Sequence, residues 1–548
     1  MEWIKNFIAG EAGKLSTKEG ALFFEKIHKD PLNLCLNKYK KLLETRSDLE
    51  LEERLQREFP KKDFHALSLP VHTIPKIHRP LPTLDDRYQN QIEQVPGEYL
   101  DFGRLTRHYI DKALVSLYPA PKKGKVLLFT YVMSDGLGDF SAQSAAAEVL
   151  KEKAPFLDVQ FLTLLPKGVR VDFPHSGLRI EYRDEEDLHF RHFSKEALEL
   201  FSSADLVLQI NTEYPHWEGL KKLVRRAETL GEYGFIASTR FHPKTENRCM
   251  GLHFLEKGIF IKNVPPLEGE PYLENRELSQ NLFEGKGVGD YQKAHRLHLA
   301  YLLTEEKMFL FLDALFTLYE KDEKPIDLVF QNIQRLLGCL QTYFHDGKDQ
   351  FPLLTQKGIR ELEIHHEGDR FIVPIAPEGK NVRFFSFDSL SPGDFQKLLA
   401  ISGPFFGCRG NQTFSEAVSA GKLFFYEVQP HTQGFFKDVI ALARARVAKG
   451  NRVVEYLEAH LDPIHGGRRM GKLLQDPKVV GALEKLGAIL REEYTVGPYL
   501  CGVVSRALVH LQHPEIARKE EELTLQLIDQ KIDFVSYIQE MKRILGNL

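Results

Sequence analysis

Two glycine turns decide the fold that this chain is expected to adopt. The first is Asp135-Gly136-Leu137-Gly138-Asp139, after an apolar run at residues 125–132, and the second is Arg409-Gly410-Asn411-Gln412-Thr413-Phe414, after Phe405-Phe406-Gly407-Cys408. Each reads as a strand, a glycine turn and a helix, which points backbone N–H groups and a helix N-terminus at a ligand above the strand end. One such turn in each half predicts an α/β protein with two Rossmann-like domains that face each other across a cleft.

The size and composition indicate a multidomain globular protein. The chain has 548 residues, 43% apolar and 27% charged, which is too long for one ordinary core. Its net charge of −4 gives no basic excess, so no nucleic-acid partner is expected. Five cysteines without a CxxC pair favour neither disulfides nor a zinc site. No signal peptide or membrane span is recognisable, so we expect a cytoplasmic protein, with secretion into another cell by a signal-independent route left open.

The pattern of apolar, helical and proline-rich segments divides the chain into five expected regions. Residues 1–120 read as a helical extension with a proline-rich linker, and residues 121–290 as the first Rossmann-like domain. A connecting helix is expected at 291–322, the second Rossmann-like domain at 323–450, and a helical region at 451–548.

Short apolar runs that alternate with helical patterns predict a parallel sheet in each domain. The expected strands lie at 126–131, 159–164, 206–210 and 235–239 in the first domain, and at 326–330, 371–375, 382–387, 404–408 and 423–428 in the second. The expected helices include 140–151, 332–344, 392–400 and 413–420.

The first turn has two readings that the residues alone leave open. Gly136 and Gly138 match half of a dinucleotide fingerprint, but Ser141 stands where GxGxxG needs its third glycine, so a NAD site is poorly supported. The glycines instead allow a large ligand to approach the backbone. Asp135 and Asp139 are placed either to cap the following helix or to serve as a general base at the mouth of a cleft.

The second turn suits a departing diphosphate. Arg409 supplies fixed positive charge, Thr413 and Ser415 supply hydroxyls, and the helix from Gln412 supplies free N–H groups. Together these groups can stabilise a diphosphate without a metal ion, and the chain contains no DxD triplet of the kind that metal-dependent enzymes use. The structural alternative is an arginine ion pair beside a threonine cap.

These motifs resemble the donor-binding half of GT-B glycosyltransferases and, more narrowly, the inverting arginine rhamnosyltransferases that modify elongation factor P. Those enzymes carry D-x-x-G-D, then R-G-x-x-S-F, then A-G-K and a later proline, and the region of resemblance covers about residues 124–450. The matching residues are Asp135, Gly138, Asp139, Arg409, Gly410, Thr413, Phe414, Ala420, Gly421, Lys422 and Pro430. The family has an acidic pair where this chain has Asn411 and Gln412, so the sugar is left open.

The resemblance implies roles for individual residues. Asp139 becomes the catalytic base, with Asp135 in support, and the 121–290 and 323–450 regions become the acceptor and donor domains. Phe330 and Phe387, which end strands, become candidates to stack on the nucleobase, although plain core positions are the alternative. The implied donor contacts are Gly136, Gly138, Phe330, Phe387, Arg409, Gly410, Asn411, Gln412, Thr413, Ser415 and Glu416.

Three functions compete at this point. The first is an inverting, metal-independent hexosyl- or deoxyhexosyltransferase that uses a nucleotide-diphosphate sugar, needs no other cofactor, and has a protein side chain as one acceptor class. The second is a sugar-nucleotide epimerase of the same fold, because fold does not fix function. The third is a non-catalytic protein that senses a nucleotide and binds a partner through its helical flanks.

Overall fold

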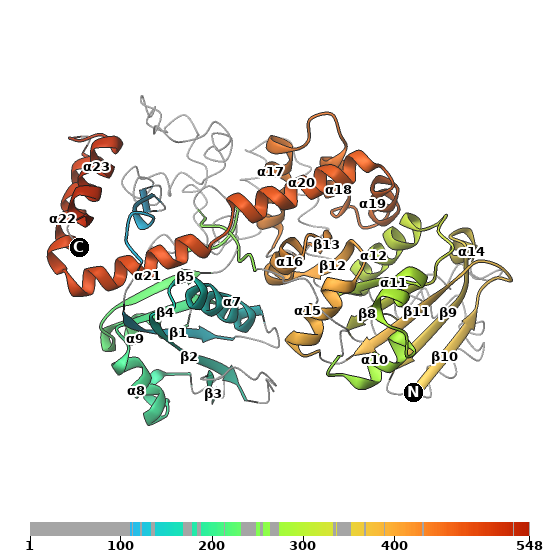
Figure 1. The fold of residues 1–548 in the computed structure, drawn as a ribbon, viewed down its shortest axis with the longest axis horizontal. Coiled ribbons are helices and arrows are strands. Elements are labelled where there is room, and N and C mark those ends of the chain that lie inside the picture. The colour runs from blue at the N-terminus through green and yellow to red at the C-terminus, as the bar shows by residue number, and fades with distance from the viewer. Residues whose placement is uncertain are drawn as a thin grey trace, which may run out of the picture.

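The computed structural model describes most of the chain after residue 109 (Figure 1). The described ranges are 110–111, 113–120, 123–132, 138–167, 178–183, 188–212, 214–231, 248–252, 256–262, 273–331, 336, 352–366, 369–387, 390–429, 432–529 and 531–546. Asp135, Gly136 and Pro430 therefore lie outside the described residues. So do the expected strand at 235–239, nearly all of the expected helix at 332–344, and most of the expected 1–120 extension.

The first domain is built on a six-stranded parallel sheet. Its strands follow the order β3-β2-β1-β4-β5-β6, which is the order of dinucleotide-binding folds. Successive strands are added on one side of β1 up to β3 and on its other side from β4 onward, so the strand order reverses between β1 and β4 while all strands stay parallel. The expected strands at 126–131, 159–164 and 206–210 are confirmed as β1, β2 and β4. The bounds are β1 Gly124–Tyr131, β2 Leu157–Pro166, β3 Leu178–Arg183, β4 Leu206–Asn211, β5 Ala227–Gly231 and β6 Arg248–Cys249.

Both faces of the first sheet are covered, which explains why its central strands are continuously apolar. Helix α7 (Gly138–Lys153) lies on one face and buries small side chains such as Ala142 and Ala146, which permit a close approach to the strands. Helix α8 (Lys195–Ser203), which Ser194 caps, lies on the other face. There Phe129 of β1 packs edge-to-face against Phe201 of α8.

The second domain holds a seven-stranded sheet in the order β10-β9-β11-β8-β7-β12-β13. All neighbours are parallel except the β9–β10 hairpin. Without that hairpin, the five strands β11-β8-β7-β12-β13 repeat the reversing order of the first sheet, with the switch between β7 and β12. The bounds are β7 Arg296–Ala300, β8 Ile326–Gln331, β9 Ile359–His366, β10 Asp369–Pro374, β11 Lys380–Phe387, β12 Phe405–Arg409 and β13 Leu423–Glu427.

The predicted connecting helix at 291–322 is wrong. Helix α11 (Val288–Ala294) ends there, strand β7 follows, and helix α12 (Glu305–Leu318) comes next. Strand β7 lies inside the second sheet, paired with β8 and β12, so this segment belongs to the second domain. Helix α10 (Arg276–Phe283) joins that domain too, because Asp394 of α15 (Pro392–Ile401) accepts hydrogen bonds from the backbone N–H groups of Glu274 and Asn275.

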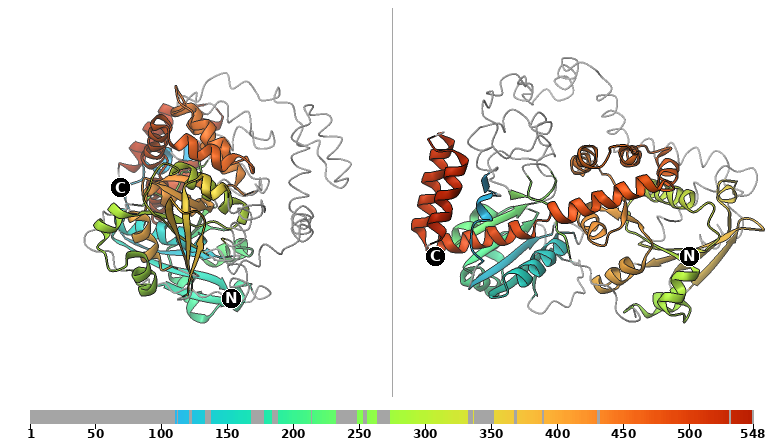
Figure 2. Two further views of the ribbon diagram at one scale, coloured as in Figure 1. Left: turned by 90° about the vertical axis from the view of Figure 1, so that its right-hand side faces the viewer. Right: turned by 45° about the horizontal axis from the view of Figure 1, so that its top comes forward.

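Helices at the C-terminal end cross from one domain to the other (Figures 1 and 2). Helix α20 (Pro477–Glu493) packs on the second domain, where Arg491 donates a 2.8 Å hydrogen bond to the Val418 carbonyl. Helix α21 (Gly497–Gln512) then returns to the first domain and packs on α7, β4 and β5. The other described helices after β12 are α16 Gly410–Ser419, α17 Gln433–Arg446, α18 Val453–Ala459, α19 Gly466–Leu474, α22 Pro514–Ile528 and α23 Phe534–Leu545.

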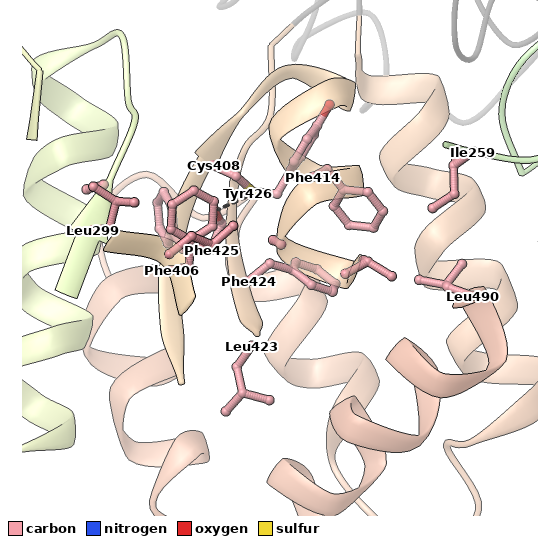
Figure 3. Close-up of a cluster of buried hydrophobic side chains, with 14 of the residues drawn as sticks. Ile259, Leu299, Phe406, Cys408, Phe414, Leu423, Phe424, Phe425, Tyr426 and Leu490 are labelled. Carbon is pink, nitrogen blue, oxygen red and sulfur yellow. Dashed lines mark hydrogen bonds between the residues drawn. The ribbon is translucent and has the colours of Figure 1, made fainter. Parts of the chain in front are cut away.

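One apolar cluster links the two domains. It runs from Leu128 and Ala146 of the first domain to Phe414 and Phe424 of the second. In Figure 3, Phe414 lies beside Phe424, with Ile259 and Leu490 on its other side. The two sheets therefore share a continuous core rather than meeting through a polar contact alone.

Candidate active site

The topology singles out two places where a ligand can bind. In open α/β sheets, ligands lie beyond the carboxyl ends of the strands, where the strand order reverses. The first reversal is between β1 and β4, and the second is between β7 and β12. Both glycine turns follow a strand at such a reversal, since α7 follows β1 and α16 follows β12.

At the first reversal, Asp139 is bonded to the end of β4. Its Oδ1 accepts hydrogen bonds from the Asn211 amide and from the Thr212 hydroxyl, the latter at 2.8 Å. Helix α7 begins at Gly138, so Asp139 lies inside the first turn and not at the N-cap position that the capping alternative requires. No atom of the described residues would lie within 4 Å of a Cβ atom at Gly138.

At the second reversal, Arg409 ends β12 and occupies the N-cap position of α16 without a side-chain cap bond. Within the described residues, its guanidinium makes no hydrogen bond or ion pair. Gly410 has a φ of 75°, which favours glycine, and no atom of the described residues would lie within 4 Å of a Cβ atom there. A half-exposed arginine, a glycine without close neighbours in the described part of the chain, and a helix N-terminus thus coincide at one strand end.

Three polar side chains of this turn bond to the protein itself. The Thr413 hydroxyl donates to the carbonyls of Arg409 and Gly410, so its proton is not available to a phosphate oxygen in this structure. Asn411 accepts a 2.7 Å hydrogen bond from the Tyr426 hydroxyl. Ser415 is fully buried and donates to the Asn411 carbonyl at 3.0 Å, so in this structure its hydroxyl is bonded within its own helix.

Glu416 and Gln412 are buried where α16 meets the first domain. The Ser141 hydroxyl of α7 donates to the Glu416 carboxylate at 3.3 Å. Burial raises the pKa of Glu416 to about 7, against the smaller opposing effects of Lys262 and Ser141. The Gln412 amide makes no hydrogen bond of ordinary geometry within the described part of the chain. The helices that start at the two glycine turns therefore touch each other.

The expected aromatic contacts with a nucleobase find no support. Phe330 is fully buried in the core, where its ring packs edge-to-face against Phe384 with centroids 6.1 Å apart. It cannot stack on a base in this structure, and the alternative of a core position holds. Phe387 ends β11 as expected, but its side chain lies outside what the structure describes.

Sequence reasoning missed three residues of this region: Asn211, Thr212 and Ser141. The first two directly follow the apolar run of β4, so a polar pair at the end of a central strand was the available signal. Among the described residues, no group of three or more His, Cys, Asp or Glu side chains has a metal-binding arrangement. Within the same ranges, every helix is too short or too polar to cross a membrane.

Comparison with known proteins returns similar folds and no relative in sequence. No family model and no curated protein matches the chain. A similar solved structure is MurG from Acinetobacter baumannii, with 12% identity, a TM-score of 0.33, and alignment over 70% of this chain and 99% of MurG. The calicheamicin glycosyltransferase CalG4 has 10% identity and a TM-score of 0.36, over 71% of this chain and 99% of its own.

A third similar structure is HepE from Anabaena, solved in complex with UDP and glucose. It has 10% identity and a TM-score of 0.36, over 70% of this chain and 99% of its own. These likenesses concern fold only, and no residue role is taken from them. The α/β class with two Rossmann-like domains that the sequence predicts is confirmed by the two reversing sheets themselves.

Proposed function

We propose that this protein is an inverting glycosyltransferase that moves a sugar from a nucleotide-diphosphate sugar to an acceptor. The observation that carries the proposal is the second reversal, where Arg409 has no partner among the described residues and stands beside Gly410 and the N-terminus of α16. A diphosphate matches this site because it accepts charge-assisted hydrogen bonds from a guanidinium and from free helix N–H groups. No metal ion or further cofactor is part of the proposal, since these groups supply the positive charge.

The reaction assigns one role to each domain. A lone pair on the acceptor heteroatom forms a bond to the anomeric carbon, while the bond from that carbon to the diphosphate oxygen breaks. The diphosphate leaves with the electron pair and is stabilised by Arg409 and α16. The acceptor proton passes to the carboxylate of Asp139. The contact between Ser141 and Glu416 supports this division, because it brings the helix of the base against the helix of the donor site.

A protein side chain is the acceptor class that we propose. The chain carries α21, α22 and α23 beside its first domain (Figure 2). Leu508 of α21 lies next to Gly124 at the start of β1, so these helices add a surface at the edge of the sheet where the strands begin. A macromolecular acceptor can dock on this added surface while its reacting side chain reaches the strand ends, whereas a small acceptor needs only the strand ends.

The test is a panel of nucleotide-diphosphate sugars, first in thermal shift and then in transfer assays. A donor that binds the native state must raise the melting temperature. With that donor, Asp139→Asn should lower turnover by about 10²- to 10⁴-fold at unchanged donor affinity, the usual contribution of a positioned base. Asp290→Asn, an exposed substitution on α11, is the matched control and should leave turnover unchanged.

Two results would contradict the proposal. If no nucleotide in the panel raised the melting temperature, the protein would have no nucleotide-sugar site at the second reversal. Release of free or isomerised sugar in the absence of any acceptor would favour the epimerase alternative, because an epimerase needs no acceptor.

A further inference from the structure

Asn211 has an unusual backbone conformation at the end of a central strand. Its φ is 67°, and among the described residues only Asn211 and Glu284 combine a side chain with a positive φ. This left-handed region is sterically unfavourable for residues with a Cβ atom, and asparagine tolerates it better than most. Such conformations persist where the surrounding structure imposes them, and they concentrate at functional sites.

Asn211 lies next to Asp139, at the end of the strand beside β1. It is the last residue of β4, the strand beside β1 at the first reversal of the sheet. Its side-chain amide donates to Oδ1 of Asp139, and the neighbouring Thr212 hydroxyl donates to the same oxygen at 2.8 Å. Two consecutive residues of one strand end therefore converge on a single carboxylate oxygen of α7.

The two donors restrict the rotation of the Asp139 carboxylate. Thr212 is almost fully buried, at 8% exposure, so its side chain packs within the protein. With Oδ1 bonded from two sides, rotation of the Asp139 carboxylate would break both bonds and leave the Thr212 hydroxyl without its carboxylate partner. The direction of the carboxylate is thus set by β4, although Asp139 itself belongs to α7.

We propose that Asn211 and Thr212 are positioning residues that aim the Asp139 carboxylate at the acceptor. The inference rests on the proposed function, because it assumes that Asp139 takes a proton from the acceptor. Neither residue is required to touch the substrate. The rival account is structural: the same bonds tie β4 to α7 and only stabilise the first domain.

The chain offers variants that remove one hydrogen bond at a time. Asn211→Gly keeps the backbone conformation, since glycine adopts a positive φ readily, and removes only the amide. Thr212→Val keeps the shape and removes the hydroxyl, while Thr212→Ser keeps the hydroxyl and serves as the conservative control. Each variant is made in the full chain, in the wild-type background and in the Asp139→Asn background.

Turnover at saturating donor and acceptor, together with donor affinity by calorimetry, is the measurement. We expect Asn211→Gly and Thr212→Val to lower kcat by about 10- to 100-fold, the effect of misdirecting a reacting group, with donor Kd unchanged. Thr212→Ser should stay within about threefold of wild type, because its hydroxyl can still donate to Oδ1. In the Asp139→Asn background the same substitutions should change kcat by less than about twofold, since no base remains to be aimed.

The possible failures are distinguishable. Wild-type kcat in Asn211→Gly and Thr212→Val, or equal losses with and without Asp139, would overturn the positioning role while leaving the proposed function in place. Full activity of Asp139→Asn would remove the base that these residues are proposed to aim, and the positioning role with it, while sugar transfer itself would stand. No transfer by the wild type would overturn the proposed function. If Asn211→Gly fails to fold, the comparison of Thr212→Val with Thr212→Ser still decides the question.

Discussion

Arg409 is the single residue whose loss should affect the donor site most directly. Because its guanidinium has no protein partner among the described residues, removing it should leave no buried charge behind. Arg409→Ala is therefore expected to weaken the binding of a nucleoside diphosphate by about 2–3 kcal/mol, the value of a charge-assisted contact. Isothermal titration calorimetry measures the change.

The control for this substitution is Arg444→Ala on α17, which removes an exposed arginine paired with Glu458. It should not alter nucleotide affinity. Arg409→Lys should fall between wild type and alanine, because lysine keeps the charge and loses the planar fork of donors. Unchanged affinity in Arg409→Ala would place the diphosphate elsewhere.

The raised pKa of Glu416 predicts how the free energy of unfolding depends on pH. Its carboxyl group has an ordinary pKa of 4.5 and a pKa of about 7 in the folded protein, so between these values the folded state binds more protons than the unfolded state. The free energy of unfolding must then fall as pH rises across this window. Glu416→Gln removes the dependence, and its stability relative to wild type should be greater at pH 8 than at pH 4.5 by about 1–3 kcal/mol.

Urea unfolding of both proteins at several pH values tests this expectation. Glu484→Gln, an exposed substitution on α20, is the matched control and should follow the wild-type pH dependence. A stability difference between Glu416→Gln and wild type that does not change with pH would show that the carboxyl group ionises in its ordinary range.

At the scale of elements, the contact between α12 and α19 depends on glycine. A Cβ atom at Gly471 would lie 2.5 Å from the Ala314 carbonyl oxygen and 2.6 Å from the Thr317 Cβ atom. Gly471→Ala should therefore force the helices apart and cost about 1–3 kcal/mol of stability. Gly481→Ala on α20, where a Cβ would meet nothing within 4 Å, should instead stabilise by about 0.5–1 kcal/mol. Denaturant titrations of the two variants should move in opposite directions.

Elements with a strong pattern of their own could be predicted, and those defined by their neighbours could not. Strands β1 and β12 are continuous apolar runs before glycine turns, and both were found. Strand β7 is five residues long and lies between helices, so the helical pattern around it hid its place beside β8. Strand β5, Ala-Glu-Thr-Leu-Gly, has no apolar pattern and is a strand only because it pairs with β4.

The same distinction applies to the site. The two turns were predictable because glycine, charge and strand ends occur together in the sequence. The partners of Asp139 were not, since Asn211 is 72 positions away and becomes a neighbour only through the order of the strands. The direction of a hydroxyl was equally hidden: Ser415 bonds to the carbonyl four residues earlier in its own helix, which a residue type alone does not reveal.

At the scale of the whole molecule, the chain crosses between its domains more than once. The segment around Ile259 leaves the first domain, and its backbone pairs with Thr495 between α20 and α21. Lys262 forms a 3.5 Å ion pair with Glu148 of α7, while its backbone N–H donates to Ser419 of α16. These crossings, together with the shared apolar cluster, predict that the two domains lose their structure together.

Leu490 of α20 tests this coupling, because it is fully buried in the shared cluster near Ile259 (Figure 3). Leu490→Ala should lower the free energy of unfolding by about 2–5 kcal/mol, as a core cavity does.

The fluorescence of Trp217 reports on the first domain, because this residue is buried there on the far side of the sheet. The measurement requires that Trp3, the other tryptophan, is replaced by phenylalanine. If the domains are one cooperative unit, Leu490→Ala must shift the Trp217 transition and the far-ultraviolet ellipticity by the same amount. A Trp217 transition that stays at its wild-type midpoint while the ellipticity shifts would mean that the first domain unfolds independently, and that the shared cluster does not couple them.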